Sequence, residues 1–138
     1  MAVDFEITID NSAEVMRELE SKIEAALEAC GNQAVSHAKQ NITRAGRVDT
    51  GAMRNSINHK VQDDTCYVGT NNEYAIYHEL GTGIYADGGK GRQTGWFYVD
   101  AHGKGHFTRG MKPIHFLKNA LSNNISEYRS IIKEYLSR

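Results

Sequence analysis

The sequence predicts an α+β fold in which a small antiparallel β-sheet packs against a long N-terminal helix and a C-terminal helix, with a long glycine-rich loop. Two segments carry apolar residues at helical spacing, and short segments between them alternate apolar and polar residues. Nine of the 13 glycines lie between Gly81 and Gly110, which places the loop. A chain of 138 residues is expected to form a single domain, residues 1–138.

The N-terminal part predicts a strand followed by the long helix. Residues 2–9 alternate apolar and polar side chains, which indicates a strand with one buried face. Asn11, with Glu14 three positions later, is similar to a capping box that would start a helix over 11–44. The second half of its apolar stripe consists of small residues, Cys30, Ala34 and Ala38. Small side chains there indicate close approach to another helix, either of this chain or of a neighbouring subunit.

A turn and a β-hairpin are expected next. Asp49-Thr50-Gly51 has turn chemistry, because the Asp side chain bonds to nearby backbone and glycine tolerates positive φ. Strands are predicted at about 56–62 and 65–70, on either side of Asp63-Asp64. A short helical turn, 73–80, follows and ends at Gly81.

The last third of the chain predicts a mobile loop and a helix. Residues 81–110 are too rich in glycine to hold one shape alone, apart from a short aromatic strand at 95–99. Apolar spacing then predicts a C-terminal helix over 113–136, with Pro113 in its first turn.

Charge and cysteine usage exclude some classes of protein. With 16 Lys and Arg against 17 Asp and Glu, binding to DNA through bulk positive charge is not expected. Cys30 and Cys66 lack Cys-x-x-Cys spacing, so they are expected to be reduced, buried thiols in a cytosolic protein. No apolar run of about 18 residues or signal-peptide pattern occurs, so the chain is expected to be made in the cytoplasm, without membrane contact.

Three patterns could carry chemistry. Asp49-Thr50-Gly51 matches the aspartic-protease triplet, but those proteases place it between apolar strands, whereas here a polar helical segment precedes it. The glycine clusters match neither a dinucleotide-binding motif nor a P-loop. Histidines near a glutamate keep a small metal-dependent hydrolase as an alternative, although the spacing is not His-Glu-x-x-His: His78, Glu79, His102, His106 and His115.

The loop region is both basic and aromatic. Lysines and arginines lie around an aromatic run that could stack on bases or dock on a protein: Lys90, Arg92, Trp96, Phe97, Tyr98, Lys104 and Arg109. The near-zero net charge favours protein docking, and a nucleic-acid-binding module remains the alternative.

Several short motifs follow one another along the chain: Asp49-Thr50-Gly51, Arg54-Asn55-Ser56-Ile57, Val68-Gly69-Thr70-Asn71, Tyr74-Ala75, His78-Glu79-Leu80-Gly81-Thr82-Gly83, Gly110-Met111-Lys112-Pro113 and Phe116-Leu117. Their order resembles a bacteriophage family, the small neck or tail-component proteins of long-tailed double-stranded DNA phages and prophages. Each is short, and their joint order over residues 12–125 carries the resemblance.

The resemblance implies a structural virion protein without catalytic residues, metal or cofactor. It would act at the head–tail junction, as a neck or tail-completion component, after assembly in the host cytoplasm. Its partners would be other copies in a homo-oligomeric ring and neighbouring connector, stopper or tail proteins.

The resemblance also implies structural roles for the motif residues, with Glu79 pairing with Arg54 or Arg109 at a hinge below the loop. These residues are Asp49, Thr50, Gly51, Arg54, Ser56, Tyr74, Ala75, Glu79, Gly81, Thr82, Gly83, Pro113, Phe116 and Leu117. Assembly contacts are expected at Tyr85, Lys90, Arg92, Trp96, Phe97 and Arg109.

Overall fold

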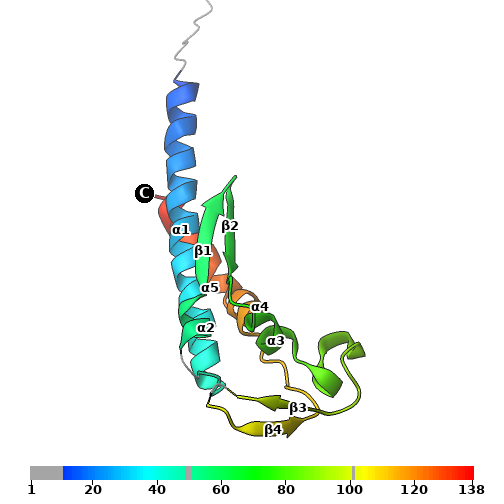
Figure 1. Cartoon of the computed structure of the whole chain (residues 1–138). Helices are drawn as coiled ribbons and strands as arrows, with labels where there is room; N and C mark the ends of the chain where they lie inside the picture. The colour runs from blue at the N-terminus through cyan, green and yellow to red at the C-terminus, as the bar shows by residue number, and fades with distance from the viewer. Residues whose placement is uncertain (1–10, 49–50, 101) are drawn as a thin grey trace, which may run out of the picture.

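The long helix α1 (Ser12–Arg44) is the axis of the molecule, and the other elements lie along its C-terminal part (Figure 1). The structure is a computed structural model that describes residues 11–48, 51–100 and 102–138. The strand expected at 2–9 lies outside these residues, as do Asp49 and Thr50. The described elements confirm the α+β class, with a long N-terminal helix, two-stranded antiparallel sheets and helices at the C-terminal end.

The elements after α1 follow one another with short connections. They are α2 (Ala52–Asn55), β1 (Asn58–Gln62), β2 (Thr65–Gly69), α3 (Ala75–Leu80), the 3₁₀ turns η1 (Gly83–Tyr85) and η2 (Asp87–Gly89), β3 (Trp96–Val99), β4 (Gly105–Thr108), α4 (Phe116–Ser122) and α5 (Ile125–Leu136). In the described chain β1 pairs with β2 and β3 pairs with β4, as two separate sheets rather than the one sheet that the sequence predicts.

The β1–β2 hairpin lies directly on α1 at a glycine. A Cβ atom at Gly31 would stand 2.3 Å from Cδ2 of His59 and 2.9 Å from Sγ of Cys66, so only glycine lets the hairpin approach this closely. His59 Nε2 also lies 2.8 Å from a carboxylate oxygen of Glu28, which ties β1 to α1. Gly31, next to the small residues of the α1 stripe, therefore makes room for the hairpin.

The hydrophobic core lies where α1, α3 and α4 meet. Its buried members are Ala38, Ile42, Ile57, Ala75, Phe116 and Ala120. Both α4 and α5 pack along α1, so the close approach predicted from its small residues is to the chain's own C-terminal helices. Burial raises the pKa of the free thiols of Cys30 and Cys66, which are buried and half-buried respectively. Both thiols are therefore held in the protonated form.

The single helix expected at 113–136 is wrong at its start and in its middle. Ile114 N donates to His78 O at 2.9 Å, and His115 has φ 48°, so the backbone becomes helical only at Phe116. The helix then breaks after Ser122, although the apolar stripe continues through the break.

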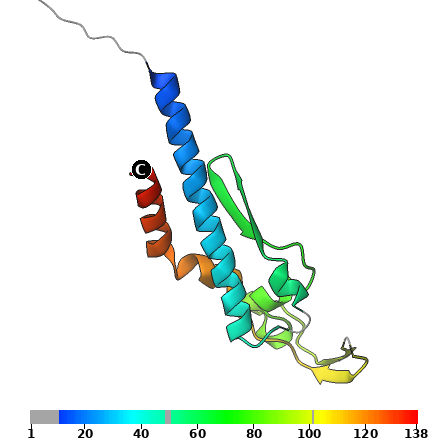
Figure 2. The same ribbon diagram turned by 90° about the vertical axis from the view of Figure 1, so that its left-hand side faces the viewer.

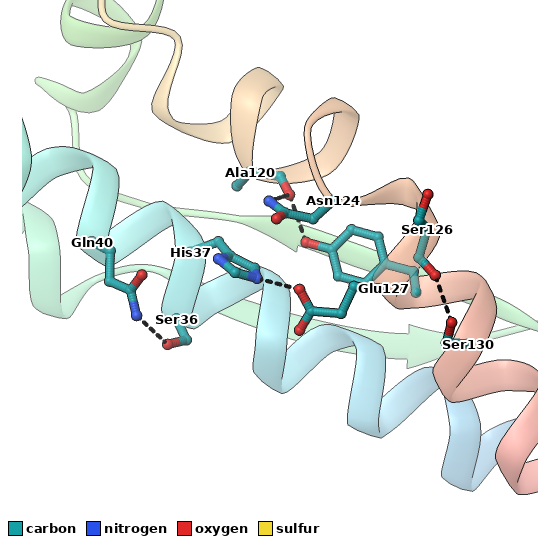
Figure 3. A network of polar contacts seen from close by, with 9 residues as sticks. Ser36, His37, Gln40, Ala120, Asn124, Ser126, Glu127 and Ser130 are labelled. Atoms are coloured by element: carbon teal, nitrogen blue, oxygen red, sulfur yellow. Dashed lines mark hydrogen bonds and ion pairs between the residues drawn. The ribbon is translucent and has the colours of Figure 1, made fainter.

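Polar contacts hold the break between α4 and α5 in place (Figure 3). Nδ2 of Asn124 and the hydroxyl of Tyr128 both donate to the carbonyl oxygen of Ala120, at 3.0 and 2.5 Å. His37 Nε2 lies 2.8 Å from Glu127 Oε2, which joins α5 to α1. Asn124 and Tyr128 thus satisfy the Ala120 carbonyl, which has lost its backbone donor where the helix is interrupted.

The segment expected to be a mobile loop, 81–110, contains regular structure. It carries η1, η2 and the β3–β4 hairpin, in which Phe97 pairs with Phe107 across the strands. Strand β4 was not predicted at all. We call residues 84–100 and 102–109 the arm, since they project from the end of the molecule opposite the first turns of α1 (Figures 1 and 2).

The first turns of α1 project beyond the rest of the molecule (Figure 2). Every residue from 12 to 21 is exposed, and we call this segment the helix tip. Lys22 Nζ donates to Arg138 O at 2.5 Å, which marks how far the chain's C-terminus reaches along α1. The capping box expected at Asn11 is wrong, because its side chain makes no capping hydrogen bond.

Candidate assembly interface

Two of the motifs that are far apart in sequence form one junction at the base of the arm. Thr82 and Met111 exchange backbone hydrogen bonds of 2.9 and 3.3 Å, and Ile84 N donates to Arg109 O at 3.0 Å. The Thr82 hydroxyl accepts a further bond from Met111 N at 2.9 Å. The arm therefore leaves and re-enters the molecule at one place.

The junction is too tight for side chains at two of its positions. A Cβ atom at Gly83 would lie 1.9 Å from the carbonyl oxygen of Arg109, and one at Gly110 would lie 2.1 Å from that of Thr82. Both glycines also have positive φ, at 61° and 139°. The Gly-Thr-Gly motif thus serves close backbone pairing, which is more specific than the hinge expected from sequence.

Glu79 caps helix α4 rather than pairing with an arginine. Its carboxylate oxygens accept from Leu117 N at 2.8 Å and Lys118 N at 3.0 Å, two of the first amides of α4. The expected partner Arg54 instead donates from Nε to the Thr43 hydroxyl at 2.8 Å. A negative charge at a helix N-terminus is favourable, so Glu79 fixes α4 to α3 from 38 residues away.

We expect Glu79→Ala to lower the free energy of unfolding by about 1–2 kcal/mol, because the change leaves two helix amides without their acceptor. Glu79→Gln keeps one acceptor oxygen and should lose less. Urea titration followed by circular dichroism measures both. Glu73→Ala, at an exposed glutamate six residues earlier, is the matched control. Equal losses from Glu79→Ala and Glu73→Ala would contradict the capping role.

Arg47 anchors the C-terminal end of α1 to the same region. Its guanidinium donates to Lys112 O at 2.6 Å and to His78 Nδ1 at 3.2 Å. Burial, and next the Arg47 charge, lower the pKa of His78, so this imidazole is held neutral and accepts at Nδ1. His78, which sequence analysis considered as a metal ligand, is placed here as a structural acceptor.

The other motif residues lie in and around the core. Ala75 and Phe116 are buried, Leu117 packs on them, and Tyr74 is exposed at the start of α3. The hydroxyl of Ser56 bonds to Met53 O and to the Thr70 hydroxyl, joining α2 to the end of β2. Gly51 has φ 83° and precedes α2, which agrees with the turn expected there. Pro113 Cδ lies against Gly81, where an added Cβ would approach it to 2.8 Å.

The arm carries all six of the expected assembly residues. Arg92 lies over the Trp96 ring at 5.4 Å, and Lys112 lies over the Tyr85 ring at 5.7 Å. Phe97 is exposed, as are the side chains of Lys90 and Arg109. The structure thus brings these residues onto one projecting element, apart from the core motifs.

Aromatic side chains organise the two faces of the β3–β4 hairpin. On one face Phe97 and Phe107 meet edge to face, with ring centroids 5.2 Å apart. On the other, Tyr98 stacks on His106 at 5.1 Å, and His106 Nε2 lies 2.7 Å from an Asp100 carboxylate oxygen. That hydrogen bond is the largest contribution that lowers the pKa of Asp100, whose other oxygen accepts from two amides of the turn.

Part of the exposed apolar surface was not predicted from the sequence. Val15, Met16 and Leu19 form an exposed group on the helix tip. Their signal was present, since they continue the α1 stripe. However, the apolar spacing does not reveal which part of the stripe other elements cover. It therefore does not predict that the first turns of α1 stay exposed.

Two further properties concern the described residues. In the ranges 11–48, 51–100 and 102–138 no group of three or more His, Cys, Asp and Glu side chains is arranged to hold a metal ion. Of the helices in these ranges, none combines the length and apolar character that crossing a bilayer requires.

Comparison with known proteins identifies one family. The family model HK97-gp10-like, described as a bacteriophage HK97-gp10 tail component, matches residues 8–81. This match covers α1, the β1–β2 hairpin and α3, and stops at the first glycine of the junction. No curated protein matches the chain, and no solved structure does.

Proposed function

We propose that this chain, which belongs to the HK97-gp10-like family of bacteriophage tail components, acts at the junction between phage head and tail. Family membership gives the coarser role, a structural tail protein that contacts other phage structural proteins. The finer role is a neck or tail-completion component that assembles into a homo-oligomeric ring. Its place would be the virion, after assembly in the host cytoplasm, beside connector, stopper or tail proteins.

One observation carries this proposal: large apolar side chains are exposed on elements that project from a small core. The exposed residues include Val15 and Met16 on the helix tip and Phe97, Val99 and Phe107 on the arm. Exposed apolar groups of this kind mark protein–protein contact sites. They suit a chain that completes its structure by contact with other proteins during assembly.

The test is electron microscopy of lysates from a phage or prophage that lacks this gene, with and without the gene supplied in trans. Filled heads and separate tails, joined again on complementation, are the expected result. A plasmid carrying the gene with an early stop codon is the matched control. Normally joined particles in the deletion lysate would overturn the junction role.

A further inference from the structure

The helix tip and the arm are the two apolar projections of the molecule, and they lie at opposite ends (Figure 1). On the tip, Val15 and Leu19 are one turn apart and Met16 lies beside them. All three are exposed, because within the described residues α5 and the β1–β2 hairpin pack only against later turns of α1.

The arm presents its apolar face to solvent to an unusual degree. Phe97, Val99 and Phe107 keep 79%, 70% and 57% of their surface exposed. Phe97 and Val99 alternate along β3 and so share one face, with Phe107 opposite Phe97 on β4. A two-stranded hairpin is only marginally stable in water unless its apolar face packs on another element. Among the described residues, none covers this face.

The two projections carry opposite charge. Residues 12–21 hold three glutamates, Glu14, Glu18 and Glu20, against Arg17. Glu18 lies 3.7 Å from Lys22 Nζ in the next turn, so Glu14 and Glu20 carry the acidic charge that the tip offers to a partner. The arm holds four basic side chains, Lys90, Arg92, Lys104 and Arg109, against Asp87 and Asp100. Both of these aspartates face a histidine of the same chain, at 3.3 Å for Asp87 and 2.7 Å for Asp100. The charge that the arm offers to a partner is therefore basic.

We propose that the arm of one copy packs its Phe97, Val99 and Phe107 face on the helix tip of a second copy. This inference rests on the self-assembly in the proposed function and names the two surfaces that meet. Apolar groups meet apolar groups in this contact, with acidic side chains beside basic ones. Arm against arm, or tip against tip, would bring like charges together.

The contact has a direct consequence for symmetry. Different surfaces of identical copies meet, so each copy keeps one unused tip or arm until the assembly closes. Repeated head-to-tail contacts of this kind build a ring when the rotation closes.

The experiment uses purified full-length chain and two variants. In the tip variant, Met16→Gln and Leu19→Gln replace apolar groups with a good helix former. In the arm variant, Phe97→Thr and Val99→Thr keep strand propensity. Tyr67→Thr, at an exposed tyrosine on β2, is the matched control. Circular dichroism checks folding, and sedimentation velocity and native mass spectrometry measure assembly.

The proposal predicts closed oligomers for the wild type and the control, and monomers for each variant alone, with association weakened at least tenfold. An equal mixture of the two variants should stop at 1:1 dimers, because only one intact arm and one intact tip remain in each pair. This outcome is specific to a contact between different surfaces.

Three results would overturn the contact. Either variant alone could still self-associate as well as the wild type, the mixture could remain monomeric, or the wild type could stay monomeric at several hundred micromolar. None of these affects the head–tail role, which the lysate experiment tests separately. Conversely, head-to-tail dimers with normally joined particles in the deletion lysate would retain the contact and reject the junction role.

Discussion

Phe116→Ala is expected to lower the free energy of unfolding by about 3–5 kcal/mol, the usual cost of removing a buried aromatic side chain. Phe116 is completely buried at the start of α4, among Ile42, Ile57 and Ala75. These neighbours come from three other segments of the chain, so one side chain holds α1, α3 and α4 together. The loss is a large fraction of the roughly 5–15 kcal/mol that stabilises a domain.

Thermal and urea unfolding measure this effect. A chain of this length should melt about 10–15 °C lower for such a loss. Leu121→Ala lies on the same helix at a side chain that is 45% exposed, so it is the matched control and should cost well under half as much. If both changes lower the melting temperature equally, Phe116 does not have the central packing role described above.

Gly83→Ala is the second change with a large expected effect. Its Cβ atom would overlap the carbonyl oxygen of Arg109 at 1.9 Å, and the backbone would have to hold φ at 61° with a side chain present. Both the overlap and the strain disappear only if the junction between the two motifs opens. We therefore expect the arm to detach from its base while the α1–α4 core persists.

Amide hydrogen exchange can test this at single residues. Thr82, Ile84 and Met111 donate the backbone bonds of the junction, so their protection should be lost in Gly83→Ala. Gly88→Ala is the matched control, since Gly88 has a similar φ of 79° but open space around its Cβ position. It should cost only the roughly 1–2 kcal/mol of left-handed strain and keep the three amides protected. Retained protection in Gly83→Ala would contradict the tight junction.

Local patterns were enough to predict α1 and the first hairpin. The 3.6-residue spacing of apolar side chains is a local property of the sequence, so it predicts the ends of α1 to within one residue. The same spacing predicts one last helix from 113 to 136, because the stripe runs through the break after Ser122. The break depends on hydrogen bonds from Asn124 and Tyr128 to the Ala120 carbonyl, and the apolar spacing does not predict those bonds.

The candidate site was less accessible from sequence because its contacts are long-range. Glu79 reaches the amides of Leu117 and Lys118, and nothing near it in sequence marks it as a helix cap. Strand β4 was missed because His106 and Phe107 stand among glycines and polar residues, where alternation is short. The motif order singles out these segments, and only the fold reveals that two of them bond to each other.

Because the base of the arm is closed, a change in the length of the arm need not alter the path of the chain before or after it. Since Thr82 and Met111 already lie side by side, inserted or deleted residues between them need not move α3 or α4. Closing a flexible segment costs only about 0.6 kcal/mol more for each doubling of its length. The arm can therefore become longer or shorter, or be replaced, without a change in the helices that hold its base. Related chains can thus evolve new contacts on the arm while the rest of the fold stays the same.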